Sequence, residues 1–189
     1  ALDIRNQCSG FIYGLSIADQ YIRSGMYKNI LVVGSEIHSG ALDKSSRGRS
    51  VSVIFGDGAG AAIVSRSNDN SEILSTHLHS EGKYAKELAV IEPSTTFWVD
   101  KIINNSSDDE IGFYPKMNGN FVFKNAVIRF EEVINEALNY SNYKVEDIDI
   151  LITHQANLRI SKFIQKKLNL EDDKVFNNIM KYGNTTAAS

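Results

Sequence analysis

Residues 148–168 read Ile-Asp-Ile-Leu-Ile-Thr-His-Gln-Ala-Asn-Leu-Arg-Ile-Ser-Lys-Phe-Ile-Gln-Lys-Lys-Leu, and two structural periods follow one another in this stretch. Residues 148–153 are mostly apolar, which is typical of a short buried strand. Residues 158–168 have an apolar face at helical spacing, formed by Ile160, Phe163, Ile164 and Leu168. The stretch therefore predicts a strand followed by an amphipathic helix, the repeating unit of an α/β fold.

The alternation of strands and helices continues toward the N-terminus. The spacing of apolar residues predicts a helix over 121–138 and a buried helix over 8–24, with Gly25 as its C′ residue. Strands are expected at residues 1–6, 30–35, 51–55, 61–65, 72–79 and 175–178, and residues 80–117 are expected to form a surface excursion. The run 30–35 is of the kind found in parallel sheets that are covered on both faces. The fold class that these patterns favour is α/β with largely parallel sheets.

The composition excludes several classes of protein. Of 189 residues, 42% are hydrophobic and 23% are charged, which rules out a disordered chain, a collagen-like repeat and a coiled coil. The net charge of −3 disfavours a protein that binds nucleic acid by neutralising phosphates. The apolar runs are far shorter than the roughly 20 residues of a membrane-spanning helix. A single cysteine excludes an internal disulfide.

The sequence divides softly near residues 66–70, where Ser, Asn and Asp cluster, into the parts 1–66 and 67–189. The chain opens at Ala1 in an alternating stretch that resembles a strand already under way. It ends at residues 185–189, Thr-Thr-Ala-Ala-Ser, which resemble the start of a helix. We interpret the chain as an internal piece of a longer protein.

Cys8 is the first residue that could carry chemistry, because it lies where an expected strand ends and the helix 8–24 begins. The partial positive charge of a helix N-terminus favours a thiolate and can lower the pKa of a cysteine from about 8.5 into the nucleophilic range. On position alone, a small buried hydrophobic residue is the more favoured interpretation of a lone cysteine.

His154 and Asn184 also stand where one element gives way to another. His154 follows the strand 148–153, at the carboxyl end where ligands of open α/β sheets bind, and it could donate to a reacting carbonyl or move a proton. The side-chain amide of Asn184 could donate to an oxyanion. Taken singly, a histidine bonded to a nearby carbonyl and a helix-capping asparagine are the simpler interpretations.

Other candidate groups give weaker signals. His77 and His79 share one face of an expected strand and could nominally bind a metal, but no third ligand stands at a diagnostic spacing, so no metal site is predicted. His38 could simply line a loop. The stretch 56–60, Gly-Asp-Gly-Ala-Gly, matches neither a P-loop nor a dinucleotide-binding loop, and we interpret it as a tight turn where backbones approach closely.

Five segments in one order make a specific combination: residues 7–11 (Gln-Cys-Ser-Gly-Phe), 55–61 (Phe-Gly-Asp-Gly-Ala-Gly-Ala), 117–119 (Met-Asn-Gly), 154–160 (His-Gln-Ala-Asn-Leu-Arg-Ile) and 182–189 (Tyr-Gly-Asn-Thr-Thr-Ala-Ala-Ser). The combination resembles β-ketoacyl-acyl-carrier-protein synthase III, a family of thiolase-fold condensing enzymes. The resemblance runs through nearly the whole chain except most of residues 83–116. It implies a layered thiolase-like fold, incomplete at both ends.

The resemblance also implies residue roles. Cys8 matches the nucleophile that accepts the acyl group, and His154 and Asn184 match its two catalytic partners. The segment that meets the acidic carrier protein matches Gln155, Ala156, Asn157, Leu158 and Arg159, and Gly119 matches a substrate-binding position. Residues 1–66 would be the second part of the N-terminal thiolase-like half, and residues 67–189 most of the C-terminal half.

The implied reaction joins an acyl-CoA to malonyl-acyl carrier protein with loss of CO₂, through an acyl-cysteine. The resemblance implies no cofactor beyond these substrates, a homodimer, a cytoplasmic location, and neither nucleic acid nor membrane as a partner. Because the segments that would complete both halves lie outside the chain, we expect the 189 residues alone to be unstable and inactive.

Two other functions stay open on the sequence. The same Cys-His-Asn set could transfer acyl groups without decarboxylation, or join two acyl chains. A protein that kept the fold but lost catalysis would be a binding or scaffold protein, although the presence of all three residues argues against it. A cysteine hydrolase of another fold is a further possibility.

Overall fold

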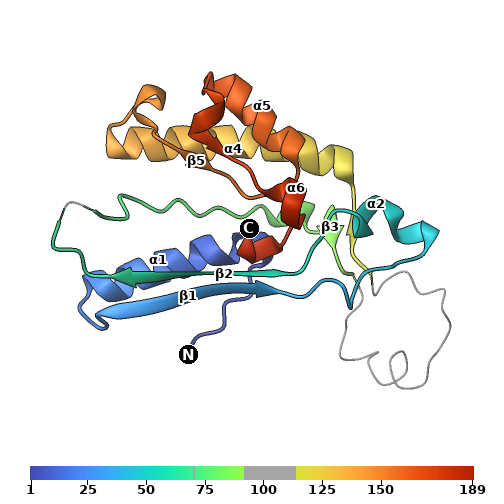
Figure 1. Cartoon of the computed structure of the whole chain (residues 1–189), viewed down its shortest axis with the longest axis horizontal. Coiled ribbons are helices and arrows are strands. Elements are labelled where there is room, and N and C mark those ends of the chain that lie inside the picture. The colour runs from blue at the N-terminus through green and yellow to red at the C-terminus, as the bar shows by residue number, and fades with distance from the viewer. Residues whose placement is uncertain (70, 92–113) are drawn as a thin grey trace.

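The computed structural model describes residues 1–69, 71–91 and 114–189, and its elements form two groups (Figure 1). In one group, a two-stranded sheet lies against the N-terminal helix. In the other, two helices from the second half of the chain lie beside each other. The last residues of the chain run from the second group to the sheet and the N-terminal helix, so they connect the two groups.

The N-terminal helix forms where the sequence predicts it. The 3-10 turn η1 (Gln7–Ser9) leads into α1 (Gly10–Arg23), and Gly25 follows it with a left-handed φ of 76°. The expectation that this helix is buried on all sides is wrong for the described residues. Only Gly14 and Ala18 of α1 are buried, because the sheet covers a single face of the helix.

The sheet of this group is antiparallel. β1 (Asn29–Glu36) pairs with β2 (Gly58–Ser65) in a register that sets Leu31 opposite Ile63. Both strands occur where the sequence predicts them, and β2 begins three residues earlier. The parallel arrangement that the run 30–35 suggested is wrong for this pair, since no long crossover helix connects the two strands.

The connection between β1 and β2 contains two short helical turns, η2 (Ser46–Gly48) and α2 (Arg49–Ser52). The expected strand at residues 51–55 is therefore wrong. Val51 is buried in α2, and only Phe55 makes an isolated bridge to a distant segment. An apolar run this short does not distinguish a strand from a buried helical turn.

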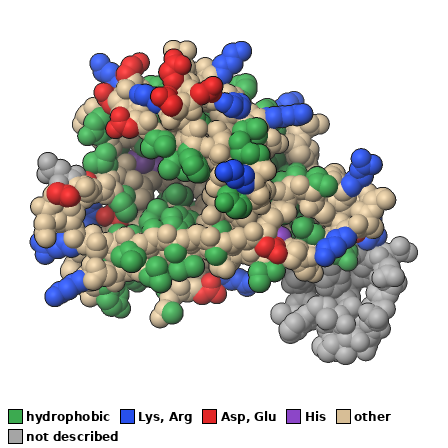
Figure 2. All heavy atoms as spheres, viewed as in Figure 1, with side chains coloured by type: hydrophobic (Ala, Val, Ile, Leu, Met, Phe, Trp, Pro, Cys, Tyr) green, Lys and Arg blue, Asp and Glu red, His purple; other side chains and the backbone are tan. Residues whose placement is uncertain are grey.

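One face of the sheet is packed and the other is open. Val32 and Gly34 of β1 are buried on the side of α1. On the opposite face, Leu31 is 64% exposed and its partner Ile63 is 72% exposed. Hydrophobic side chains accordingly gather at the surface over this sheet (Figure 2). Within the described residues, only one face of the sheet is covered, whereas the sequence predicts a sheet that is covered on both faces.

Two further expected strands are absent from the described ranges. Residues 1–6 and 72–79 form neither helix nor strand. Both segments have the apolar alternation of a strand, but a strand also requires a neighbour for its N–H and C=O groups. Neither segment pairs with a strand within the described part of the chain, so the prediction from alternation alone is wrong for both.

The second group is built on two helices that the sequence predicts well. α4 (Gly119–Ser141) starts at Asn118, whose side chain accepts a hydrogen bond from the Phe121 N–H, and extends the expected helix at both ends. α5 (Leu158–Leu168) has the predicted bounds. The rings of Phe123 and Phe163 meet edge to face at 6.3 Å and join the two helices.

A short parallel pair lies under these helices. β5 (Leu151–Ile152) pairs with β6 (Val175–Phe176), which confirms both predicted strands and their parallel direction, although each is only two residues long. The α/β class is confirmed. The predominance of parallel strands is not, because two of the three described sheets are antiparallel.

The remaining elements are short. The first part of the expected excursion contains η3 (Gly82–Tyr84) and β3 (Leu88–Ala89), which pairs antiparallel with β4 (Lys116–Met117), whereas residues 92–113 lie outside the described residues. The other turns and helices are η6 (Val145–Asp147), η7 (Asp172–Lys174), α6 (Ile179–Tyr182) and η8 (Thr186–Ala188). Among helices in the described ranges, none has the length and apolar character needed to cross a membrane.

Glycines of both long strands let the C-terminal segment lie directly on the sheet. A Cβ added at Gly34 would come within 2.5 Å of the Ala187 carbonyl oxygen, and one at Gly58 within 2.8 Å of the Thr185 side chain. The stretch 56–60 is thus the place of close backbone approach that the sequence predicts. It is not a tight turn, since Gly58 and Gly60 belong to β2.

This contact generates a prediction for Gly34→Ala. The added methyl group cannot fit against the main chain of Ala187, so the substitution should destabilise the natural protein by about 1–3 kcal/mol, as overpacking does in a well-packed core. Gly40→Ala is the matched control, because nothing lies within 4 Å of its added Cβ. Chemical unfolding measures both variants. Equal midpoints for the two variants would contradict the close packing of residues 182–188 on the sheet.

Candidate active site

Asn184 is fixed by its main chain and its side chain together. Its N–H donates to the Ile54 carbonyl oxygen at 2.9 Å, and its own carbonyl accepts from the Gly56 N–H at 2.9 Å. The side-chain oxygen accepts from the Thr186 N–H at 2.9 Å, and the residue is 5% exposed. Because the oxygen is already engaged, the NH₂ group is the part of this amide that is left to donate to a ligand.

Cys8 is the middle residue of the turn η1, two positions before Gly10, the first residue of α1. Gln7 has a φ of 41°, a left-handed value that is uncommon for a residue other than glycine and that often marks a functional turn. η1 packs against η8, and a Cβ added at Gly10 would lie 3.5 Å from the Cβ of Ala187. The turn that carries Cys8 therefore contacts the segment that follows Asn184.

The pKa of the Cys8 thiol is raised, whereas the position of Cys8 before a helix predicts that it is lowered. Burial raises the pKa of Cys8 to about 11, a hydrogen bond with its own main chain opposes this shift, and the negative charge of Glu36 adds to it. The expectation that the helix N-terminus lowers this pKa is therefore wrong. Loss of hydration outweighs the main-chain hydrogen bond that favours the thiolate, and the thiol is protonated at neutral pH.

His154 follows β5 and contacts the end of the same C-terminal segment. Its Nδ1 atom lies 3.3 Å from both the main-chain oxygen and the hydroxyl of Ser189. Its Nε2 atom is buried and has no hydrogen-bond partner among the described residues. Burial lowers the pKa of this imidazole, and the contact with the Ser189 oxygen only partly opposes the shift, so the ring is neutral at pH 7.

Residues 184–189 therefore connect the three predicted groups. Asn184 is the first residue of this segment, the His154 ring contacts its last residue, and η1 with Cys8 packs against η8 in its middle. Segments that are distant in the sequence thus meet at residues 184–189, and the joint action of Cys8, His154 and Asn184 stays a prediction.

Sequence reasoning missed one member of this neighbourhood. His38 bonds through Nδ1 to the Gly56 carbonyl oxygen at 2.8 Å and through Nε2 to the Thr186 hydroxyl at 2.9 Å. A carbonyl oxygen only accepts, so Nδ1 carries the proton and Nε2 accepts from Thr186. The ring also stacks on Phe55 at 4.9 Å. His38 thus holds the start of η8 in place, a role for which no local sequence signal exists.

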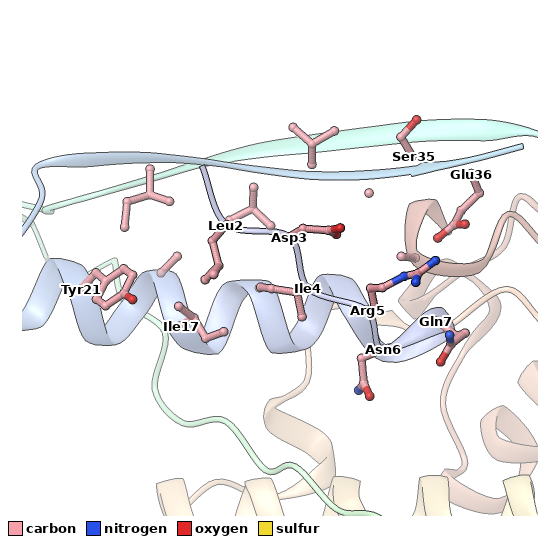
Figure 3. Close-up of a pocket in the computed structure, with 18 residues that line it drawn as sticks. Leu2, Asp3, Ile4, Arg5, Asn6, Gln7, Ile17, Tyr21, Ser35 and Glu36 are labelled. Atoms are coloured by element: carbon pink, nitrogen blue, oxygen red, sulfur yellow. The ribbon is translucent and has the colours of Figure 1, made fainter. Parts of the chain in front are cut away.

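A cavity of about 500 Å³ lies beside this region (Figure 3). It is bounded by residues 2–7, by one face of α1 and by β1 as far as Glu36, and Ala187 of η8 also lines it. Cys8, His154 and Asn184 are not among its lining residues. A second, smaller cavity lies between α2 and β4. There the carboxylate of Asp43 pairs with Arg47 at 2.7 Å.

The two histidines considered for metal binding share one carboxylate. Glu136 of α4 meets His77 Nδ1 at 3.1 Å and His79 Nε2 at 2.7 Å. No three histidine, cysteine or carboxylate side chains in the described ranges are placed to hold a metal ion. These contacts hold the extended segment 71–79 against α4.

The residues expected to meet a carrier protein differ in exposure. Asn157 and Arg159 are exposed, and Asn157 caps α5 by accepting from the Arg159 N–H at 2.9 Å. Ala156 and Leu158 are half-buried. Gln155 is 4% exposed, which leaves its side chain no surface for a partner and corrects that expectation. Gly119, the expected substrate-binding glycine, is the exposed first residue of α4.

Comparisons with known proteins agree with one another. The model of 3-oxoacyl-(acyl-carrier-protein) synthase III matches residues 2–82, and the model of its C-terminal part matches residues 138–189. A β-ketoacyl-(acyl-carrier-protein) synthase III from Aquifex aeolicus is 45% identical over all 189 residues, which cover 54% of that protein. The chain thus spans about half the length of the curated relatives it matches.

Solved structures are similar along the same length. The crystal structure of the Aquifex aeolicus synthase III has a TM-score of 0.84 to this chain, covering 100% of it and 55% of that protein. The synthase III of Thermus thermophilus, 34% identical, has a TM-score of 0.85 with 100% and 56% covered. The neighbours have the thiolase-like fold that the sequence predicts.

The shifted thiol generates a prediction for Cys8, the single cysteine of these 189 residues, followed by peptide mass spectrometry in the natural protein that contains them. Alkylation follows the thiolate fraction, so the rate with iodoacetamide should still be rising at pH 10 in the folded protein, because the pKa is about 11. In urea the same cysteine should level off above its ordinary pKa of about 8.5. Glu36→Gln should move the folded profile to lower pH. A folded profile that levels off at or below pH 8.5 would show that burial does not control this thiol.

Proposed function

The chain belongs to the 3-oxoacyl-(acyl-carrier-protein) synthase III family, and on this premise we propose that its protein condenses an acyl-CoA with malonyl-acyl carrier protein in fatty-acid or related biosynthesis. Cys8 is the proposed nucleophile, and His154 and Asn184 are its proposed partners. The observation that carries the proposal is that the segments bearing Cys8 and His154 both contact residues 184–189, which begin with Asn184. The two thiolase-like halves, divided near residue 66, are part of the same proposal.

The first half-reaction transfers the acyl group to Cys8. The sulfur attacks the thioester carbonyl, a new C–S bond forms, the bond to CoA breaks, and CoA leaves as the thiol after taking up the proton that Cys8 gives up. The raised pKa of Cys8 keeps this proton on the sulfur until substrate is present. The thiol is thereby protected from unwanted alkylation and oxidation, which require the thiolate.

The second half-reaction generates a carbanion from the malonyl group. Loss of CO₂ places negative charge on the thioester oxygen, and two neutral donors, His154 Nε2 and the NH₂ of Asn184, would stabilise it. For Nε2 to carry the proton, Nδ1 must accept a hydrogen bond; the Ser189 hydroxyl 3.3 Å away would supply it by turning from the Thr186 carbonyl oxygen, to which it donates at 3.2 Å in this structure. The carbanion then attacks the acyl carbonyl, a C–C bond forms, and the bond to Cys8 breaks; the sulfur leaves with the electron pair and takes up a proton from solvent.

The proposed partners are the substrates themselves and a second copy of the protein. The exposed Arg159, at the start of α5, supports contact with an acidic carrier, because a guanidinium suits carboxylate and phosphate groups. No cofactor is included in the proposal. The reaction needs only the two thioesters and one proton, which replaces on the Cys8 sulfur the proton that left with CoA.

The variant His154→Ala, made in the natural protein that contains this chain, tests both the proposed reaction and the role of His154 in decarboxylation. Wild type should release CO₂ from malonyl-acyl carrier protein, and the variant should lose about 10²–10³-fold of that rate while Cys8 is still acylated by acyl-CoA. The exposed His79→Ala is the control and should retain both rates. Acylation without any CO₂ release in wild type would favour non-decarboxylating transfer. Equal loss of both steps in His154→Ala would make His154 the base for Cys8.

Arg159→Glu tests the carrier contact. Reversing this charge should raise the apparent KM for acyl-carrier-protein substrates about tenfold and leave the KM for CoA substrates unchanged, with the difference shrinking at high salt. Lys166→Glu, two turns further along α5 and also exposed, is the matched reversal. An equal effect of both reversals would mean that only the overall charge of α5 matters.

A further inference from the structure

Gln155 is a buried side chain whose hydrogen-bonding groups are all used. Its Nε2 atom donates to the carbonyl oxygens of Thr153 at 2.9 Å and Phe176 at 3.3 Å. Its Oε1 atom accepts from the N–H groups of Asn178 at 2.9 Å and Ile179 at 3.2 Å. A glutamine amide has two donor hydrogens and two acceptor sites, so this one is fully satisfied.

The partners of Gln155 come from two segments that carry the proposed site. Thr153 precedes His154 at the end of β5. Phe176, Asn178 and Ile179 belong to the end of β6 and the start of α6, from which the chain reaches Asn184 after one turn of helix and Gly183. The side chain that directly follows His154 therefore bridges to the segment that leads to Asn184.

The bonds of Gln155 take the place of main-chain pairing between β5 and β6, which stops after two residue pairs. The ladder between β5 and β6 has two residue pairs and stops at Ile152 and Phe176. Beyond this ladder, the four hydrogen bonds of Gln155 connect the ends of the two strands before the strands diverge. Removing the amide would leave two carbonyl oxygens and two N–H groups in the interior without these partners.

We propose that Gln155 is a positioning residue that sets His154 at its working distance from Asn184. This inference rests on the proposed function, in which both groups donate to the same oxygen. A displacement of about 1 Å between groups that act together can reduce a rate about 10²-fold, so this bridge controls the decarboxylation step. It does not control acylation, which takes place at Cys8 on a different element.

A second buried glutamine provides a matched control within the same helix region. Gln165 of α5 is 7% exposed and also holds a loop, donating to the Leu170 carbonyl oxygen at 3.2 Å and to Asp172 at 2.8 Å. Its loop enters β6 at Val175, whereas the bonds of Gln155 hold the other end of β6, from which the chain continues to Asn184. Gln165→Leu thus removes a buried, hydrogen-bonded amide, as Gln155→Leu does, and leaves its former partners without that bond. It does so outside the bridge that we propose to position His154.

The experiment compares Gln155→Leu with Gln165→Leu in the natural protein that contains this chain. Gln155→Leu should slow CO₂ release from malonyl-acyl carrier protein about 10²-fold and leave acylation of Cys8 by acyl-CoA within twofold. Gln165→Leu should leave both rates within twofold even where it lowers the unfolding midpoint. Equal losses in the two variants, or unchanged CO₂ release in Gln155→Leu, would overturn the proposal.

A spectroscopic readout separates this proposal from the proposed function. The imidazole protons of His154 should titrate at higher pH in Gln155→Leu than in wild type, toward the ordinary value of about 6.5, because the released ring gains water; in Gln165→Leu they should not move. An unchanged His154 titration in Gln155→Leu overturns the positioning role whatever the enzyme assays give. A wild-type protein that releases no CO₂ overturns the function instead.

Gln155→Glu keeps the experiment decisive if the leucine variant does not fold. The carboxylate fills the same volume and still accepts from the Asn178 and Ile179 N–H groups, but it cannot donate to the Thr153 and Phe176 carbonyl oxygens. CO₂ release should fall about tenfold with acylation retained. Full retention of CO₂ release in this variant would contradict the proposal.

Discussion

The close approach of residues 182–188 to the glycines of β1 and β2 is the contact on which the rest of this structure depends. Side chains at Gly34 or Gly58 would collide with the main chain or the side chains of that segment. Because these positions have no Cβ, the segment lies flat on the sheet, and Asn184 pairs its main chain with Ile54 and Gly56. From there the segment reaches η1 on one side and His154 on the other.

The groups at this place are kept uncharged by burial. Loss of hydration raises the pKa of the Cys8 thiol and lowers the pKa of the His154 imidazole, so both are neutral near pH 7. In such surroundings a hydrogen bond to a developing negative charge is worth more than it is in water. Neutral donors that are already fixed in place suit a reaction in which negative charge develops on a substrate oxygen only after the substrate has bound.

The sequence predicts the parts of this structure that depend on local periodicity. α4 and α5 have one apolar stripe each; the spacing of apolar residues gives the bounds of α5 and the central part of α4, which extends beyond the predicted range at both ends. Residues 1–6 and 72–79 have the alternation of strands, but a strand also depends on its neighbour, which local sequence does not contain. The site residues were predicted by a family resemblance. The burial of Gln155, the bonds of His38 and the raised pKa of Cys8 come from tertiary packing that no short motif encodes.

An experimental structure of the natural protein with an acyl group on Cys8 would test the central claim most directly. The account predicts that the thioester of Cys8, the Nε2 atom of His154 and the NH₂ group of Asn184 line one continuous cavity, with residues 184–189 seated on the glycines of the sheet. The account would be contradicted by a structure in which these three groups open into separate cavities, or in which residues 184–189 leave the sheet.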